Sequence, residues 1–317
     1  MKRRILRVAF VVLGVGAGAL AAGLVMAHVA IRKERAPLPT VDEVMASASA
    51  ADLPVSLSWI NTASQAMSRS VVLDPKLDPA PDAPYVMSHS SFVLEWADGR
   101  ILLIDTGMDR DGAIAFGGPI ERLSGGEPIQ PLASPATRLG TDTERVQAVV
   151  FTHLHSDHVG GIAELCRGLS HPVKVFMTEA QSDRPNYTTR GGRRLIAGTP
   201  CAQVEALGAE ALRPVAGFPG VYVVAAGWHT PGSQIVIAHV QGDPQRTFVF
   251  TGDIVNAIDG VLHDVPKPVS YSLFIVPEDR ERLAELRHFL RTLHDRGASL
   301  LVSHDQRQLE ASGVPLR

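Results

Sequence analysis

Cysteine is scarce in this chain of 317 residues, which contains only Cys166 and Cys201. No nearby motif arranges either thiol as a nucleophile, so the sequence counts against a mechanism based on cysteine attack. The two side chains could pair in an exported domain, but nothing in the sequence brings them within disulfide range. We therefore predict structural roles for both, with Cys166 as a small buried side chain on a helix.

An excess of positive charge is missing from most of the chain. Residues 1–35 carry seven Lys or Arg and one acidic residue, whereas residues 36–317 carry 23 basic and 32 acidic residues, a net charge of −9. An acidic surface is a poor electrostatic match for a phosphate backbone. The charge therefore counts against a nucleic-acid partner, and we interpret the small basic cluster Arg190, Arg193 and Arg194 as solvated surface charge.

The N-terminus differs from the rest of the chain because it contains a long uncharged run. Val8–Ala27 has no charged residue, four basic residues precede it, and its length in a helix matches a bilayer core of roughly 30 Å. We predict a transmembrane signal anchor over residues 1–31, a linker over 32–51 and one catalytic domain over 52–317, since no internal repeat divides the chain. The charge bias places that domain outside the cytoplasm. Export with cleavage after Val25-Met26-Ala27 is the alternative.

A dense group of metal-ligating side chains lies near the middle of the chain. His153, His155, Asp157 and His158 follow the apolar run Val146–Phe151 and precede Ile162–Leu169, which has helical apolar spacing. Alternation along an extended backbone points His153 and His155 the same way, so they can share one metal. Asp157 and His158 begin the helix and can hold a second ion. Imidazole and carboxylate ligands suit zinc, with iron, manganese or cobalt as alternatives.

Three later apolar runs each end in a further ligand type. They are Val221–Ala226 before His229, Thr247–Phe250 before Asp253, and Ser299–Val302 before His304. The carboxyl ends of strands are where α/β architectures gather their functional loops. The spacing therefore predicts that these side chains join the first four.

The ordered motifs resemble the metallo-β-lactamase superfamily over residues 52–310. The resemblance rests on Asp105-Thr106-Gly107 and on the seven ligand types, and the segments Trp228–Ser233 and Ser303–Gln306 are closest to the branch of N-acyl homoserine lactonases and organophosphate hydrolases. It implies an α/β fold, an αββα sandwich of two mixed sheets flanked by helices. It also implies two ligand sets with Asp253 as the bridge: His153, His155 and His229 for the first metal, and Asp157, His158 and His304 for the second. Asp105 would orient the ligand loop.

The resemblance implies hydrolysis of an ester or lactone in a small molecule by hydroxide held between two divalent ions, with zinc favoured and with Asp157 and Asp253 as catalytic residues. A di-iron redox centre is disfavoured, because that branch usually has glutamate where this chain has His155. The lactonases commonly place tyrosine three residues after the bridging aspartate, where it assists the substrate carbonyl and where this chain has Asn256. Asn256 could itself donate a hydrogen bond there, or Tyr187 or Tyr271 could reach the site from a loop. Four alternatives stay open: a glyoxalase II-like thioesterase, a β-lactamase, a phosphotriesterase, and a non-catalytic metal-binding module anchored in the membrane.

The remaining pattern predicts a few elements around this site. Ser91–Trp96 and Arg100–Ile104 should form a hairpin about Asp98-Gly99, and Glu278–Arg296 has the apolar spacing of an amphipathic helix. Gly117–Pro135 and Asp183–Thr199 have no clear period and are predicted to be loops near the site. The sequence assigns no role to His89.

Overall fold

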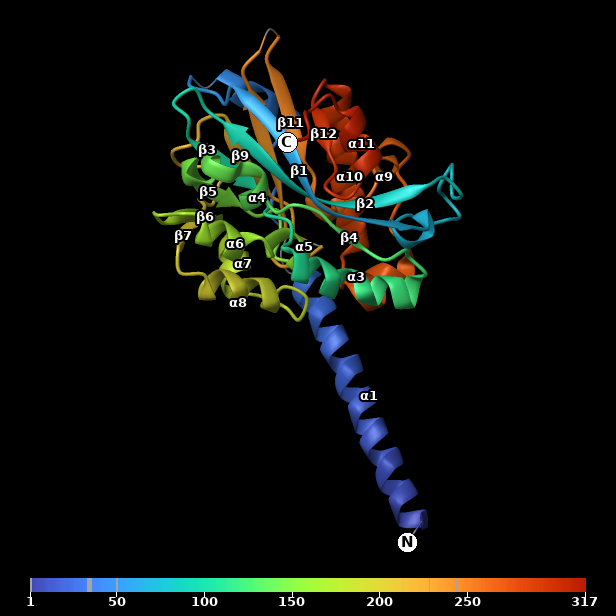
Figure 1. Cartoon of the computed structure of the whole chain (residues 1–317). Helices are drawn as coiled ribbons and strands as arrows, with labels where there is room; N and C mark the ends of the chain where they lie inside the picture. The colour runs from blue at the N-terminus through green and yellow to red at the C-terminus, as the bar shows by residue number, and fades with distance from the viewer. Residues whose placement is uncertain (1, 33–35, 50, 228, 243) are drawn as a thin grey trace.

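The computed structural model describes residues 2–32, 36–49, 51–227, 229–242 and 244–317 (Figure 1). Two mixed sheets form its body. The first sheet has the strand order β4 (Gln130–Pro131), β1 (Ser56–Met67), β2 (Tyr85–Glu95), β3 (Ile101–Ile104), β5 (Val146–Val150), β6 (Val173–Met177) and β7 (Ala202–Ala206). The second has the order β12 (Ser299–Leu301), β11 (Arg246–Phe250), β10 (Gln234–Val240), β9 (Val221–Ala225) and β8 (Leu212–Pro214).

The described residues also form helices, all but the first of which pack around the two sheets (Figure 1). They are α1 (Lys2–Arg32), α2 (Val41–Ala46), α3 (Arg110–Ser124), α4 (Pro135–Leu139), α5 (Ser156–Val159), α6 (Ile162–Arg167), α7 (Glu179–Asp183), α8 (Arg190–Gly198), α9 (Asp259–Leu262), α10 (Arg280–Asp295) and α11 (Gln306–Ala311). Shorter helical turns are η1 (Ser47–Ser49), η2 (Arg69–Val71), η3 (Gly140–Arg145), η4 (Gly252–Ile254) and η5 (Tyr271–Ile275).

The core between the sheets is aromatic and aliphatic. Trp59 and Phe92 from the first sheet meet Phe250 from the second, and the rings of Phe92 and Phe250 lie edge to face with centroids 4.8 Å apart. Burying a side chain of this kind stabilises the fold by about 1.5–3 kcal/mol. The predicted αββα sandwich is therefore confirmed in its sheets and helices.

Each sheet also buries its outer face under helices. Leu286 and Leu290 of α10 pack against the second sheet, as the amphipathic spacing of this segment predicts, and Ile162 of α6 packs against the first. The predicted hairpin is confirmed: β2 pairs antiparallel with β3, and Gly99 has the positive φ of 91° that the turn requires. Residues 41–46, in the predicted linker, form α2 and bury Val44 against the same layer as α10.

The prediction of loops over Gly117–Pro135 and Asp183–Thr199 is wrong in part. α3 continues to Ser124 through Gly117 and Pro119, and α8 occupies residues 190–198. Packing decides the outcome at Gly117, where an added Cβ would lie 2.4 Å from Cβ of Ile129. Glycine at this position lets the helix approach Ile129, so tertiary contact outweighs the weak helix propensity of glycine and proline.

Helix α1 extends away from the body as one long helix, and only its C-terminal end touches the rest of the chain (Figure 1). Ala27 and Ile31 are buried there, and Nε2 of His28 lies 3.1 Å from the carbonyl oxygen of Leu273. Across the described residues, no helix has the length and apolar character needed to cross a bilayer. The transmembrane prediction for Val8–Ala27 is thus unsupported and stays a prediction, because the side chains of residues 8–15 lie outside those described.

The two cysteines form a disulfide, which the sequence had left open. Cys166 on α6 and Cys201 just before β7 have Cα atoms 5.6 Å apart. The bond ties the helix that follows the ligand turn to an edge of the first sheet.

Candidate metal centre

Four chain segments deliver the seven predicted ligands to one edge of the sandwich. His153 and His155 lie in the turn after β5, and Asp157 and His158 lie in α5, as the sequence predicts. The turn needs glycine at its far end, because a Cβ on Gly161 would lie 2.3 Å from the carbonyl oxygen of Thr106. The close approach fastens the ligand turn to the segment after β3.

The other three segments are brought together by strand pairing. β10 pairs with both β9 and β11, and β11 pairs with β12 in parallel. Asp253 follows β11 and His304 follows β12, so parallel pairing puts them side by side. His229 follows β9, in the connection to β10. Trp228, part of the motif quoted above, lies outside the described residues.

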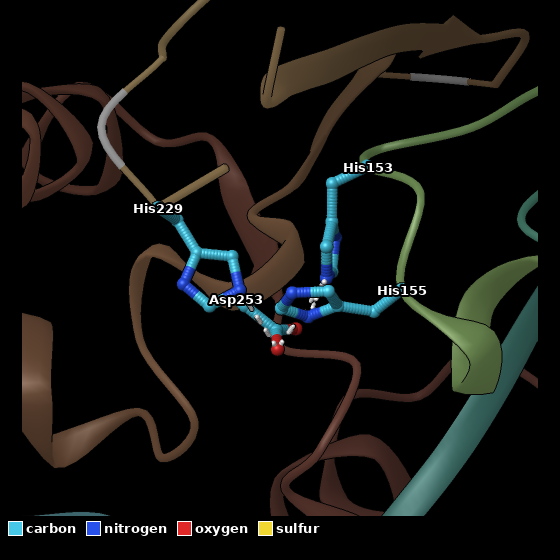
Figure 2. A group of neighbouring side chains, drawn as sticks. All are labelled: His153, His155, His229 and Asp253. Atoms are coloured by element: carbon cyan, nitrogen blue, oxygen red, sulfur yellow. Dashed lines mark hydrogen bonds and ion pairs between the residues drawn. The ribbon is translucent and has the colours of Figure 1, made fainter. Parts of the chain in front are cut away.

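The first group consists of His153, His155, His229 and Asp253 (Figure 2). Oδ2 of Asp253 lies 3.7 Å from Nε2 of His153 and 3.5 Å from Nε2 of His229. Nε2 of His153 lies 3.0 Å from Nδ1 of His155. These are the three histidines that the resemblance assigns to the first metal.

The second group places His158 and His304 on the other oxygen of Asp253. Oδ1 lies 3.2 Å from Nε2 of His158 and 3.0 Å from Nε2 of His304. Asp157 adjoins them, with Oδ2 3.5 Å from Nε2 of His304. The carboxylate of Asp253 therefore faces one group with each oxygen, which is the arrangement a bridging ligand requires.

The separations and the free electron pairs fit divalent ions. Ligand atoms about 2.0–2.2 Å from a common tetrahedral ion lie about 3.3–3.6 Å apart, close to the separations above. Nε2 of His229 is buried, points at Asp253, and has no hydrogen-bond partner among the described residues. A buried polar atom without a partner is costly. An ion at this position would satisfy it.

Each outward ring nitrogen in the second group is held by an oxygen. Nδ1 of His158 lies 2.8 Å from Oδ2 of Asp105, and Nδ1 of His304 lies 2.6 Å from the carbonyl oxygen of Ser88. Asp105 also accepts hydrogen bonds from the backbone N–H and the hydroxyl of Thr152, both at 2.7 Å. Asp105 thus orients the ligand loop, as the resemblance implies, and both bonds fix which ring nitrogen faces the centre.

The outward nitrogen of His229 is held by a residue to which the sequence analysis gave no role. Nδ1 lies 2.7 Å from Oε1 of Glu278, and Nζ of Lys267 donates to the same oxygen at 2.8 Å. All three side chains are buried. Burial raises the pKa of Glu278, but Lys267 and His229 outweigh it and lower that pKa to about 2. No motif marks this pair, because Lys267 and Glu278 come from the chain between β11 and β12.

His89 is a second residue that the sequence left without a role. It lies in β2, fully buried, with Nδ1 3.2 Å from Oδ2 of Asp157, and it forms a compact group with Asp157 and His304. Burial lowers the pKa of His89, which favours the neutral ring. His89 thus contacts Oδ2 of Asp157, the oxygen that also lies 3.5 Å from Nε2 of His304, and helps to hold this carboxylate in place.

Burial and neighbouring charges set the protonation of the centre. Burial lowers the pKa of His155 to about 3 and that of His153 well below its ordinary value, so both rings are neutral at pH 7 and able to bind a metal. Burial also lowers the pKa of His158, but the carboxylates of Asp105 and Asp253 outweigh it and raise that pKa well above its ordinary value. Carboxylates that favour positive charge on an imidazole favour a cation in the same place.

A pocket of about 390 Å³ opens over the two groups. His155, Asp157, Asp253 and His304 lie at its floor, and most of its wall is apolar. The wall is formed by Met67, Val71, Val72, Met87, Phe116, Pro119, Ile120, Leu123, Ile275 and Val276. An apolar wall over a polar floor suits a substrate with one reactive polar group and an apolar remainder.

Of the three residues that could take the place of the missing tyrosine, two line this pocket. They are Asn256, which is buried, and Tyr271. Tyr187 is not among the lining residues and is half exposed, whereas its neighbour Thr188 does line the pocket.

A family model described as the metallo-beta-lactamase superfamily matches residues 84–295. This is more than half of the chain and contains six of the seven predicted ligands, with His304 beyond its end. The chain belongs to the metallo-beta-lactamase superfamily. It is a metallo-hydrolase, and the His and Asp groups described above are where it can bind divalent metal.

Several proteins resemble this chain in sequence or in fold. Ribonuclease TTHA0252 of Thermus thermophilus is 30% identical over 186 residues, which is 54% of this chain but only 36% of that relative. An N-acyl homoserine lactone hydrolase with its product N-hexanoyl-L-homoserine at the catalytic metal center has a TM-score of 0.59 at 17% identity, over 82% of this chain and 96% of that chain. AidC, a dizinc quorum-quenching lactonase, has a TM-score of 0.53 at 14% identity, over 80% and 90%. At such identities the two structures show a common fold alone.

Proposed function

We propose that the protein hydrolyses the ester or lactone bond of a small molecule with an apolar portion, using two divalent ions, most simply zinc. The observation that carries the proposal is the position of Asp253, whose two oxygens face two separate groups of histidines at the floor of an apolar pocket. His153, His155 and His229 would hold one ion, and Asp157, His158 and His304 the other. When bound, the ions would supply a hydroxide near neutral pH and polarise the substrate carbonyl.

The chain's own residues would position the substrate and handle the proton. Asn256 and Tyr271 line the pocket beside Asp253, and either can donate a hydrogen bond to the substrate carbonyl oxygen. Oδ1 of Asp157 is buried, and none of the described residues hydrogen-bonds to it, so it can accept the proton of the attacking water. Hydrolysis then forms a carbon–oxygen bond from water and breaks the bond to the leaving oxygen, which takes the proton.

The test combines metal analysis of the purified protein with hydrolysis of a panel of a lactone, a thioester, a β-lactam and a phosphotriester. We expect two metals per chain and the highest kcat/KM on the lactone. The variant Asp157→Asn should lose activity on every substrate, whereas Leu316→Ser, at an exposed position in the C-terminal segment, should keep it. Fewer than two metals together with no hydrolysis would contradict the proposal.

RNA belongs in the same panel, because one relative is a ribonuclease. The net charge of −9 on residues 36–317 opposes binding to a phosphate backbone. We therefore expect no RNA cleavage. If RNA were cleaved faster than the lactone, the substrate class proposed here would be wrong.

We further propose that the N-terminal segment anchors the protein, with the catalytic domain outside the cytoplasm. The uncharged run Val8–Ala27 between basic residues supports this location, and so does the disulfide Cys166–Cys201, since disulfides persist in oxidising compartments. Carbonate extraction of cell membranes should leave the chain in the pellet, and protease added on the outer side of the cytoplasmic membrane should digest it. A soluble chain beginning just after Ala27 would instead indicate cleavage.

A further inference from the structure

The mouth of the pocket is bordered by exposed apolar side chains. Leu123 of α3 and Ile275 of η5 line the pocket and are at the same time 85% and 61% exposed. Phe274, Leu273 and Val269 continue the exposed surface beside Ile275. We call these five residues, Leu123, Val269, Leu273, Phe274 and Ile275, the apolar rim. A cluster of large apolar side chains in water is unfavourable and usually marks a contact surface.

The apolar rim is continuous with exposed apolar side chains on α1. His28 of α1 contacts the carbonyl oxygen of Leu273 in the rim, which fixes this helix beside it. Leu20, Val25, Met26 and Val29 of α1 are exposed as well. Within the described residues, most of the exposed large apolar side chains therefore fall on three neighbouring segments: α1, α3 and residues 269–275. Figure 1 shows α1 leaving the body at the end where α3 and α8 lie, opposite the C-terminus.

The remaining side of the mouth carries the side chains that favour a lipid–water interface. Thr188 lines the pocket, and its neighbour Tyr187 is 51% exposed. Arg190, which lies two residues after Thr188 at the start of α8, is also exposed. Tyrosine is enriched at the level of lipid headgroups, and arginine is attracted to anionic lipids. The border is also continuous with α1, which carries the uncharged run of the proposed anchor, and this continuity favours a lipid surface over a protein partner.

We propose that the apolar rim docks on the surface of a lipid bilayer, so that the pocket opens onto lipid. The rim inserts among the acyl chains while Tyr187 and Arg190 lie at the headgroups. An amphiphilic substrate can then enter from the bilayer, with its apolar part along the wall of the pocket and its reactive polar group at the metal centre. The docking of the rim does not depend on the proposed function. The entry of substrate from the bilayer does rest on the proposed function.

A depth measurement tests the docking. In the full chain, Phe274→Cys is labelled with a nitroxide and mixed with vesicles of phosphatidylcholine and phosphatidylglycerol; the disulfide leaves the new cysteine as the only free thiol. Leu316→Cys is the matched control, since Leu316 is 59% exposed in the C-terminal segment away from α1. We expect the label at 274 to collide several-fold more with oxygen and several-fold less with a soluble nickel chelate than the label at 316. Equal accessibility of the two labels would overturn the proposal, even if α1 alone holds the chain on the vesicles.

A kinetic measurement tests the route of the substrate. The variant Val269→Ser/Phe274→Ser changes two rim residues that do not line the pocket. For this double variant we expect the KM for a long-chain lactone embedded in vesicles to rise about tenfold. Its KM for a short-chain lactone in solution should not change. The control Leu316→Ser should leave both KM values unchanged. An equal effect on both lactones would contradict entry from lipid. If neither lactone is hydrolysed, the proposed function fails while the label experiment still decides the docking.

The other occupant to be tested is a second copy of the chain. Light scattering in the absence of lipid should give one mass for the wild type and for Val269→Ser/Phe274→Ser. A wild-type dimer that these two substitutions dissociate would assign the apolar rim to self-association and overturn the proposal.

Discussion

The two halves of the candidate metal centre hold their histidines in different ways. In the second half, His158 is held by Asp105, a carboxylate whose other hydrogen bonds come from Thr152, next to the ligand turn. In the first half, His229 is held by Glu278, whose charge is balanced by the buried Lys267. In the second half the charge of Asp105 is met by His158 and by the uncharged donors of Thr152, whereas in the first half the charge of Glu278 is met by the buried cation of Lys267. Both halves orient their histidines, but loss of the carboxylate should cost more stability in the first half, because breaking a buried ion pair leaves a charge without a partner.

The largest effect should come from Asp253, the one side chain that the halves share. Asp253→Asn keeps the shape but removes the charge that faces both groups of histidines. We expect loss of both metals and a fall in kcat/KM of more than about 100-fold, since changing even an outer partner of a ligand commonly costs 10–100-fold. Metal analysis and kinetics measure this. Retention of one tightly bound metal would show that the halves are independent.

The variants Glu278→Gln and Asp105→Asn test whether the two halves differ in what holds their histidines. Each should weaken the metal of its own half by about 10–100-fold, measured by competition with a chelator. Only Glu278→Gln should also destabilise the fold by about 3–5 kcal/mol, because Lys267 is left buried without its counter-charge. The double variant Lys267→Met/Glu278→Gln is the control and should recover much of that stability. If both single variants lose the same stability, the ion pair is not what distinguishes the halves.

The disulfide should matter for stability and not for the ligands. Cys166→Ser/Cys201→Ser removes a link that closes a loop of 35 residues, and we expect a loss of about 2–4 kcal/mol in urea unfolding. Both metals should bind as before. A drop in the metal of the second half alone would show that α6 needs its covalent tie to hold the ligand turn.

The smallest effect is a pH dependence carried by Glu278. Its pKa is lowered to about 2 in the folded chain from an ordinary value of 4.5. A depressed carboxylate pKa contributes stability above pH 4.5 that is lost as the pH falls toward 2. The free energy of unfolding should therefore fall more steeply over this interval in the wild type than in Glu278→Gln. Parallel curves would mean that the ion pair contributes no pH-dependent stability.

The ligand-bearing part of the centre was predictable because its signals are local. Each segment that carries ligands follows a buried apolar run, and strand pairing then brings these segments together, so His229, Asp253 and His304 lie beside the HxHxDH turn as the sequence predicts. Glu278 and His89 were not predictable in this way. Glu278 was included in the predicted helix, but α10 begins at Arg280, and the residue turns toward His229 instead.

The surroundings of the pocket were harder to predict for a different physical reason. α3 contains Gly117, Gly118 and Pro119, whose propensities indicate a loop, but its cap at Asp109 and its close contact with Ile129 favour the helix. Such contacts join residues that no local pattern connects.

The wall of the pocket and its floor come from different segments. Phe116 and Leu123 of α3 and Ile275 of η5 line the wall, yet neither of these elements contributes a side chain to the two groups of metal-ligating residues. A substitution at Phe116, Leu123 or Ile275 can therefore change the shape of the pocket without replacing a residue of either metal-ligating group. If the protein acts as proposed, a new substrate preference could arise through changes at these wall positions while the metal-ligating residues stay the same.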